Sequence, residues 1–134
     1  MIKQKLAKIL CASVLISAIA GTSVFAAERQ TYTAYKIPAM KGNNYTGIHQ
    51  KEGTKGYITN KVTAMTDVST VTFWAINGNY EQISNDYDQK VGNQTDIVFT
   101  TVGYNKKGVE VGMGMENASV TPTVGFVSGW VNFH

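Results

Sequence analysis

The most regular pattern in the chain is GVEVGMGMEN, residues 108 to 117, in which every second position is apolar. Successive side chains of a β-strand point to opposite faces, so this alternation predicts a strand with one buried face. The apolar face consists of Val109, Val111, Met113 and Met115, and the other face of Glu110, Gly112, Gly114 and Glu116. Glycine weakens a strand, so we expect Gly112 and Gly114 to mark a bulge, an overlying aromatic ring or a ligand.

Six further segments combine β-branched and aromatic residues and are separated by turns rich in Gly, Asn and Thr. Together with residues 108–117 they make seven predicted strands: 30–37, 57–65, 69–76, 79–84, 96–103, 108–117 and 123–134. After residue 27, no stretch shows helical spacing over three turns. We therefore predict an all-β fold, an antiparallel two-sheet β-sandwich, in which residues 123–134 are central because they are apolar on both faces.

The first predicted hairpin has Asn77-Gly78 at its turn, a pair typical of type I′ geometry. The strand before this turn is expected to point Val71, Phe73 and Ala75 to one face and Trp74 and Ile76 to the other. In the earlier segment 57–65, Ile58, Val62 and Ala64 are expected to share the buried face.

A second hairpin is predicted between Asp96 and Glu116, with its turn at residues 105–108. Each arm is about nine residues long, which approaches the length of a membrane-spanning strand. The first arm does not alternate, because Ile97, Val98 and Phe99 are all apolar. This favours a buried strand of a sandwich over a membrane-inserting hairpin.

The N-terminus has the features of a secretory signal peptide. Three lysines precede an apolar run of about a dozen residues, and small residues follow up to Ala26 and Ala27. The run is shorter than the roughly 20 residues of a spanning helix, so we expect no stable membrane anchor. The predicted organisation is a cleaved signal peptide, residues 1–27, followed by a single β-sandwich domain, residues 28–134, that is secreted.

Cleavage would change the charge of the protein. The formal charge of +3 comes from twelve basic and nine acidic residues, and Lys3, Lys5 and Lys8 belong to the signal peptide, so nine of each sign remain. Nucleic-acid binding, which needs a surplus of Lys and Arg, is therefore not expected. The single cysteine, Cys11, is also removed, so packing without disulfides has to stabilise the domain. Eleven of the twelve basic residues are lysine, a bias that fits a low-GC Gram-positive bacterium.

Candidate catalytic residues are few. His49 is the one internal histidine, and no nucleophile elbow accompanies it. Glu110 and Glu116 would lie about 20 Å apart along one strand, too far for a glycosidase pair. We therefore predict no enzymatic activity and no cofactor.

An oxygen-rich loop, NDYDQKVGNQTD, offers a candidate calcium site. Its acidic residues are Asp86, Asp88 and Asp96, with Asn85 and Asn93 as further oxygen donors. The spacing differs from that of an EF-hand, and Asp and Asn are also common in turns.

Aromatic residues and the bare glycines supply the candidate ligand-binding surface. Rings with an apolar face and a polar tip suit sugars or protein contacts. The residues selected on this basis are Trp74, Tyr104, Gly112, Gly114 and Trp130.

The signal peptide, the cysteine-free mature region and segments such as VTFWAING and VSGWVNFH resemble small Sec-exported all-β proteins of Gram-positive bacteria, including uncharacterised families and lactococcin-972-like bacteriocins. The resemblance implies a secreted, non-enzymatic protein that acts through its surface on a cell-surface component, a glycan or a protein. Two classes stay open: a bacteriocin-like antagonist, which a detachable amphipathic hairpin would support, and a module that binds cell wall, glycan or protein, which coplanar exposed rings would support.

Overall fold

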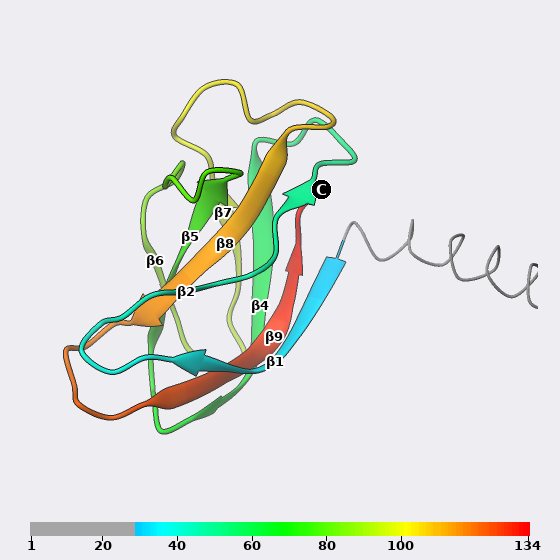
Figure 1. Ribbon diagram of the computed structural model, residues 1–134. Helices are drawn as coiled ribbons and strands as arrows, with labels where there is room; N and C mark the ends of the chain where they lie inside the picture. The colour runs from blue at the N-terminus through cyan, green and yellow to red at the C-terminus, as the bar shows by residue number, and fades with distance from the viewer. Residues whose placement is uncertain (1–28) are drawn as a thin grey trace, which may run out of the picture.

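The computed structural model describes residues 29–134, and the predicted signal peptide lies outside them. Nine strands are present in this range (Figure 1). Their bounds are β1 Arg29–Ile37, β2 Asn44–Tyr45, β3 His49–Gln50, β4 Tyr57–Thr66, β5 Val71–Asn77, β6 Tyr87–Gln89, β7 Gln94–Val98, β8 Glu110–Asn117 and β9 Gly125–Asn132. The range contains no helix long and apolar enough to cross a membrane.

The strands form two antiparallel sheets packed face to face, which confirms the predicted β-sandwich. The four-stranded sheet has the order β1-β9-β4-β7. The five-stranded sheet has the order β2-β8-β5-β6, and β3 also pairs with β8. As predicted, β9 is central, because it is hydrogen-bonded to β1 on one side and to β4 on the other.

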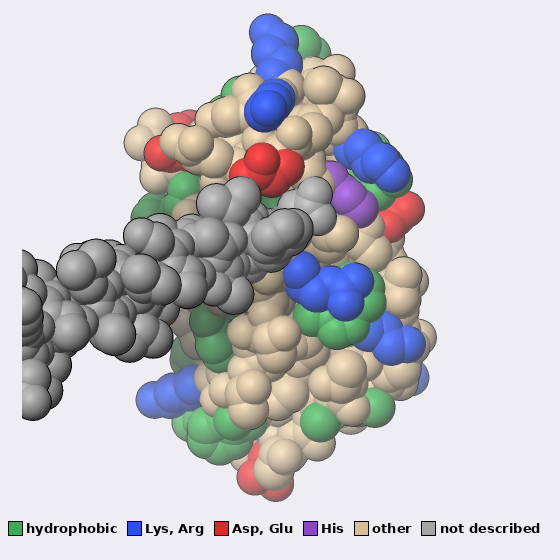
Figure 2. Space-filling view, turned by 90° about the vertical axis from the view of Figure 1, so that its right-hand side faces the viewer, with side chains coloured by type: hydrophobic (Ala, Val, Ile, Leu, Met, Phe, Trp, Pro, Cys, Tyr) green, Lys and Arg blue, Asp and Glu red, His purple; other side chains and the backbone are tan. Residues whose placement is uncertain are grey.

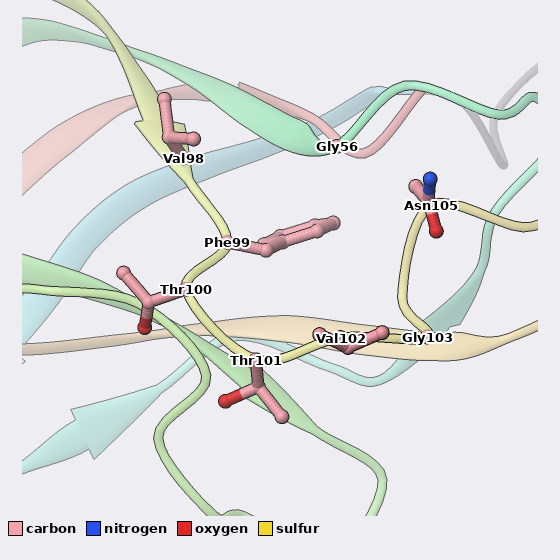
Figure 3. A pocket seen from close by; sticks show the side chains of 8 residues that line it. All are labelled: Gly56, Val98, Phe99, Thr100, Thr101, Val102, Gly103 and Asn105. Carbon is pink, nitrogen blue, oxygen red and sulfur yellow. The ribbon is translucent and has the colours of Figure 1, made fainter.

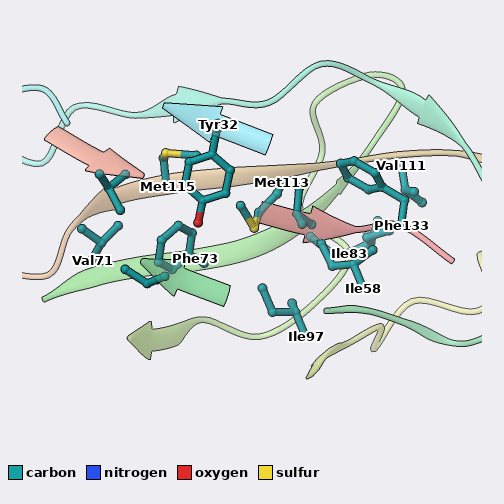
Figure 4. Packing of buried hydrophobic residues seen from close by; sticks show 14 of the residues in the cluster. Tyr32, Ile58, Val71, Phe73, Ile83, Ile97, Val111, Met113, Met115 and Phe133 are labelled. Carbon is teal, nitrogen blue, oxygen red and sulfur yellow. The ribbon is translucent and has the colours of Figure 1, made fainter. Parts of the chain in front are cut away.

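The hydrophobic core lies between the sheets and draws on both of them (Figure 4). On β8, Val111, Met113 and Met115 are fully buried, as the alternation predicts, whereas Val109 lies before the strand begins. On β5, Val71, Phe73 and Ala75 are likewise fully buried. Burial of these apolar side chains is the main force that holds the two sheets together.

A chain of buried polar side chains crosses this core. The Tyr32 hydroxyl donates to Asn60 Oδ1 at 2.7 Å, and Asn60 Nδ2 donates to Gln89 Oε1 at 2.9 Å. Burial raises the pKa of Tyr32, and the hydrogen bond to Asn60 opposes this shift. Because the three residues come from β1, β4 and β6, their bonds tie the two sheets together in one register.

Two predictions about local structure are wrong. Ala64 is exposed instead of buried, because a bulge between Val62 and Ala64 inserts one extra residue and reverses the facing of the strand. The predicted hairpin from Asp96 to Glu116 does not form, because β7 pairs with β4 in one sheet and β8 pairs with β5 in the other. The segment between them crosses from sheet to sheet.

Candidate ligand-binding surface

Trp74 lies flat across Gly114 on the outer face of the five-stranded sheet. The two residues are direct partners in the pairing of β5 with β8. A Cβ atom at Gly114 would overlap the indole ring, so glycine is required for this close approach. The glycine therefore marks an overlying aromatic ring, one of the explanations that the sequence pattern allows.

Tyr45 and Tyr80 extend Trp74 into a group of three rings, which we call the aromatic cluster. Tyr45, on β2, pairs with Gly114 from the other side, and its ring meets Trp74 edge-on at 6.4 Å. The Tyr80 ring meets Tyr45 at 5.2 Å and 79°. Trp74 is 6% exposed and Tyr80 is 53% exposed, so within the cluster the Tyr80 ring is accessible to solvent and the Trp74 ring is not. The rings are not coplanar.

Tyr80 is held in an unusual backbone conformation. Its φ is 62°, in the left-handed region that glycine adopts readily and other residues avoid. The Tyr80 amide donates to Asn77 O, and the Asn77 side-chain oxygen accepts from the amides of Asn79 and Glu81. The hairpin thus forms, but not with the predicted type I′ turn, since Gly78 has no positive φ and Tyr80 has one.

Polar groups border the aromatic cluster. Asn43 Nδ2 donates to the Tyr45 hydroxyl at 3.2 Å. The carboxylate of Glu110 packs against Gly78 at the start of the hairpin turn. The surface therefore combines one exposed ring with amide and carboxylate groups that can bond to hydroxyls.

Gly112, the second predicted glycine, is covered by the protein itself. It is buried, and a Cβ atom there would lie 3.0 Å from the Ile48 side chain and 3.2 Å from Gly47 O. The segment between β2 and β3 thus fills the space above Gly112, which leaves no room for a ligand. Gly112 therefore lies beneath Gly47 and Ile48 and not on an open surface.

Tyr104 lies apart from the aromatic cluster, in the connection between β7 and β8. Its hydroxyl accepts a hydrogen bond from Asn77 Nδ2 at 3.0 Å, and its ring meets Phe99 edge-on at 6.4 Å. Phe99 lines a hollow of about 350 Å³ in which its side chain extends toward Asn105 (Figure 3). The hollow contains no ionisable side chain and has Val102, which is 96% exposed, among its lining residues.

Trp130 lies on the outer face of the four-stranded sheet, whereas Trp74 lies on that of the five-stranded sheet. The two tryptophans predicted to bind a ligand therefore do not belong to one site. Its cross-strand partners are Thr31 on β1 and Lys61 on β4. The Arg29 guanidinium carbon lies 3.9 Å from the centre of the indole ring.

The predicted calcium cluster is not assembled. Asp88 is on β6 in the five-stranded sheet and accepts from Thr72, whereas Asp96 is on β7 in the four-stranded sheet and accepts from Thr59. Asp86 accepts from Gln82. Among residues 29–134, no three Asp, Glu, His or Cys side chains are grouped closely enough to hold a metal ion.

His49 is packed as part of the structure. Its ring stacks on Phe133 at 4.4 Å and 16°, and its Nε2 lies 2.6 Å from Gln30 Oε1. Burial lowers the pKa of His49, so its neutral form is favoured at physiological pH.

Lys51 is a buried cation that sequence reasoning missed. Its side chain is 1% exposed, and its ammonium donates to Phe133 O at 2.8 Å and lies 5.3 Å from the centre of the Phe99 ring. Burial lowers the pKa of Lys51 to about 8. No sequence signal distinguished this lysine from its exposed neighbours. Tyr45 and Tyr80 belong to the tyrosines whose rings suit sugars or protein contacts, but the sequence did not single them out as site residues.

Comparisons with known proteins find similarity to solved structures alone. No family model matches it, and no curated protein matches its sequence. Solved structures with partial similarity include PirA (7% identity, TM-score 0.44, covering 80% of this chain and 94% of that one). The carbohydrate-binding module CBM36 in complex with calcium and xylotriose has 9% identity and a TM-score of 0.41, covering 80% of this chain and 94% of that one. The xylan-binding module CBM15 has 8% identity and a TM-score of 0.43, covering 76% of this chain and 84% of that one. At these scores we transfer no function from them.

Proposed function

We propose that the protein is an exported, non-catalytic module that binds a neutral glycan through the aromatic cluster. The observation that carries the proposal is Tyr80, an exposed ring held at a φ of 62°. The left-handed conformation costs a non-glycine residue about 1–2 kcal/mol. Backbone strain of this kind concentrates at functional sites, where the surrounding structure has to maintain it.

The chemistry around the aromatic cluster favours an uncharged sugar as the ligand. The outward charged residues on the strands of this sheet are Asp88, Glu110 and Glu116, all acidic. Glu116 is paired with Lys41, so Asp88 and Glu110 are the acids that repel anionic ligands and accept hydrogen bonds from sugar hydroxyls. Because Tyr45 and Tyr80 are close to perpendicular, one sugar ring stacked on Tyr80 fits better than a flat crystalline chain.

The antagonist hypothesis loses the feature that would support it. It relied on a hairpin from Asp96 to Glu116 that can detach, and these two residues lie in strands of different sheets. Releasing them would disrupt pairs in both sheets, including that of β8 with β5.

The binding proposal is tested with purified protein by pull-down and calorimetry on soluble xylan and soluble oligosaccharides of cellulose and chitin, with crystalline cellulose as the flat chain that is expected to bind less well. We expect Tyr80→Ala to lower the affinity for the bound polysaccharide at least tenfold and Tyr80→Phe to retain it. Phe126→Ala is the matched control, because Phe126 is an exposed ring, 37% exposed, on the opposite face.

A Tyr80→Gly variant separates binding from stability. Glycine relieves the left-handed strain, which offsets the loss of the ring contact with Tyr45, so the free energy of unfolding stays within about 1 kcal/mol of the wild type. Binding is lost in the same variant. Retained binding, or unfolding that becomes much easier, would mean that Tyr80 is a structural brace and would refute the proposal.

Export is tested separately. When the full chain is expressed in an exporting bacterial host, we expect protein in the medium whose intact mass lacks the first 26 or 27 residues. Retention of the full-length chain inside the cells would contradict this part of the proposal.

A further inference from the structure

The outer face of the four-stranded sheet carries a second, differently built surface. Its register places Thr31, Trp130, Lys61 and Gln94 in one row across all four strands. The neighbouring row consists of Arg29, Asn132, Thr59 and Asp96. Strands in a sheet are about 4.8 Å apart, so each row is about 14 Å long.

Arg29 and Lys61 are positioned on the two sides of Trp130. The Arg29 guanidinium stacks on the indole at 3.9 Å, which orients its plane and leaves the N–H groups at its edge able to donate. Lys61 is the cross-strand partner of Trp130, and its ammonium donates to Gly92 O at 2.9 Å. An ammonium has three donors, so Lys61 retains capacity for a further acceptor.

These cations are not neutralised by acids. Within the described part of the chain, the one ion pair is Lys41 with Glu116, which involves the other sheet. The outward charged residues on the strands of this sheet are Arg29, Lys36, Lys61 and Asp96. Asp96 accepts a hydrogen bond from Thr59, two positions from Lys61 along β4. On the side shown in Figure 2, Lys and Arg side chains stand beside a hydrophobic patch near its centre.

We propose that this face, centred on Arg29, Trp130 and Lys61, binds a polyanionic glycan. Its carboxylate or phosphate groups pair with the two cations, which lie on neighbouring strands of Trp130. Sugar rings contact the part of the indole that Arg29 leaves exposed, and Thr31 and Gln94 bond to hydroxyls along the row. A row about 14 Å long accommodates roughly three sugar units of an extended chain. The site shares no residue with the aromatic cluster, so it does not depend on that proposed function.

The test measures binding to three soluble polymers that separate charge from sugar. Polygalacturonate carries both features, polyphosphate carries charge alone and dextran carries sugar alone. In the Tyr80→Ala background, where the aromatic cluster has lost its exposed ring, we expect polygalacturonate to bind most tightly, polyphosphate more weakly and dextran not at all. The affinity for polygalacturonate should fall as salt is added, because exposed charges are screened.

Variants assign the binding to this face. Arg29→Gln with Lys61→Gln should lower the affinity for polygalacturonate at least tenfold. Trp130→Ala should lower it severalfold and weaken polyphosphate binding less, because Arg29 loses its stacking partner but keeps its charge. The matched control, Lys106→Gln with Lys107→Gln, makes the same change of net charge at exposed residues of the loop between β7 and β8. Circular dichroism melts show whether each variant is folded. If the double variant Arg29→Gln with Lys61→Gln does not fold, Lys61→Gln alone takes its place.

Three results would overturn the proposal. Equal loss of affinity in the control variant would show diffuse attraction by net charge. Polyphosphate that binds as tightly as polygalacturonate would show that the sugar is not recognised. Dextran that binds Tyr80→Ala as tightly as polygalacturonate does would show that the charge is not recognised, because this variant lacks the exposed ring of the aromatic cluster. Tyr80→Ala should leave polygalacturonate binding unchanged, which keeps failure of this site distinct from failure of the aromatic cluster.

Discussion

The two outer faces of the sandwich each carry an outward tryptophan, and the residues opposite these tryptophans give them different roles. Trp74 faces Gly114, so its ring lies down on the sheet and is 6% exposed. Trp130 faces Thr31 and Lys61, whose side chains occupy the space beside it, and its ring stays partly exposed beneath Arg29. The cross-strand neighbour, more than the tryptophan itself, therefore decides whether the indole packs on the sheet or stays exposed to solvent.

Removing each indole should give the largest difference between the faces. Trp74→Ala should lower the free energy of unfolding by about 3–5 kcal/mol, the usual cost of deleting a buried large aromatic. Trp130→Ala should cost about 1 kcal/mol, because its ring is partly exposed already. Urea denaturation of both variants measures the contrast, and equal costs would mean that the faces do not differ in this way.

Adding a methyl group opposite each tryptophan is the next test. Gly114→Ala should cost about 2–3 kcal/mol, because the new Cβ overlaps the Trp74 ring and forces it off the sheet. Thr31→Val, which places a methyl beside Trp130, should change the free energy of unfolding by less than about 0.5 kcal/mol. Near-ultraviolet circular dichroism should change in the first variant alone. A Gly114→Ala protein of wild-type stability would contradict the packing described above.

A smaller effect, the dependence of stability on pH, distinguishes the buried Lys51 from the partly exposed Lys61. The pKa of Lys51 is lowered to about 8 in the folded protein and is near 10.5 when unfolded, so the unfolded chain binds more protons between these values. The free energy of unfolding therefore rises with pH, by about 2 kcal/mol from pH 7 to pH 10. The raised pKa of Tyr32 opposes this rise above pH 10.

Denaturant titrations at pH 7, 8, 9 and 10 measure this dependence. Lys51→Met should abolish the rise, whereas Lys61→Met, on the open face, should keep it. A rise that persists in Lys51→Met would assign the effect to another group.

Much of the sandwich follows from periodicity. The alternation around β8 correctly gave Met113 and Met115 to the core and Gly114 to the outer face, because a period of two fixes the facing of a regular strand. The period fails where the strand is irregular, as at the bulge that exposes Ala64. Neither the bulge nor the pairing partner of a strand has a local sequence signal.

The candidate sites depended on such pairings and were therefore predicted less well. Asp88 and Asp96 are close in sequence, but the chain changes sheets between them, so the predicted calcium cluster does not form. Trp74 and Gly114 were selected for their residue types, yet only the register shows that one lies on the other. Lys51 is buried because β3 pairs with β8 and the backbone near Phe133 passes close to it, and both partners are distant in the sequence.

The central position of β9 sets the order in which the protein can fold. Arg29 pairs with Asn132, so the first described strand finds its partner only after the last one has been made. At the usual rates of synthesis, β1 waits on the order of 5–20 s for residues 125–132. During this interval β4 also lacks its central neighbour, and the four-stranded sheet stays open. Synthesis of β9 is therefore the step that allows β1 and β4 to join in one sheet.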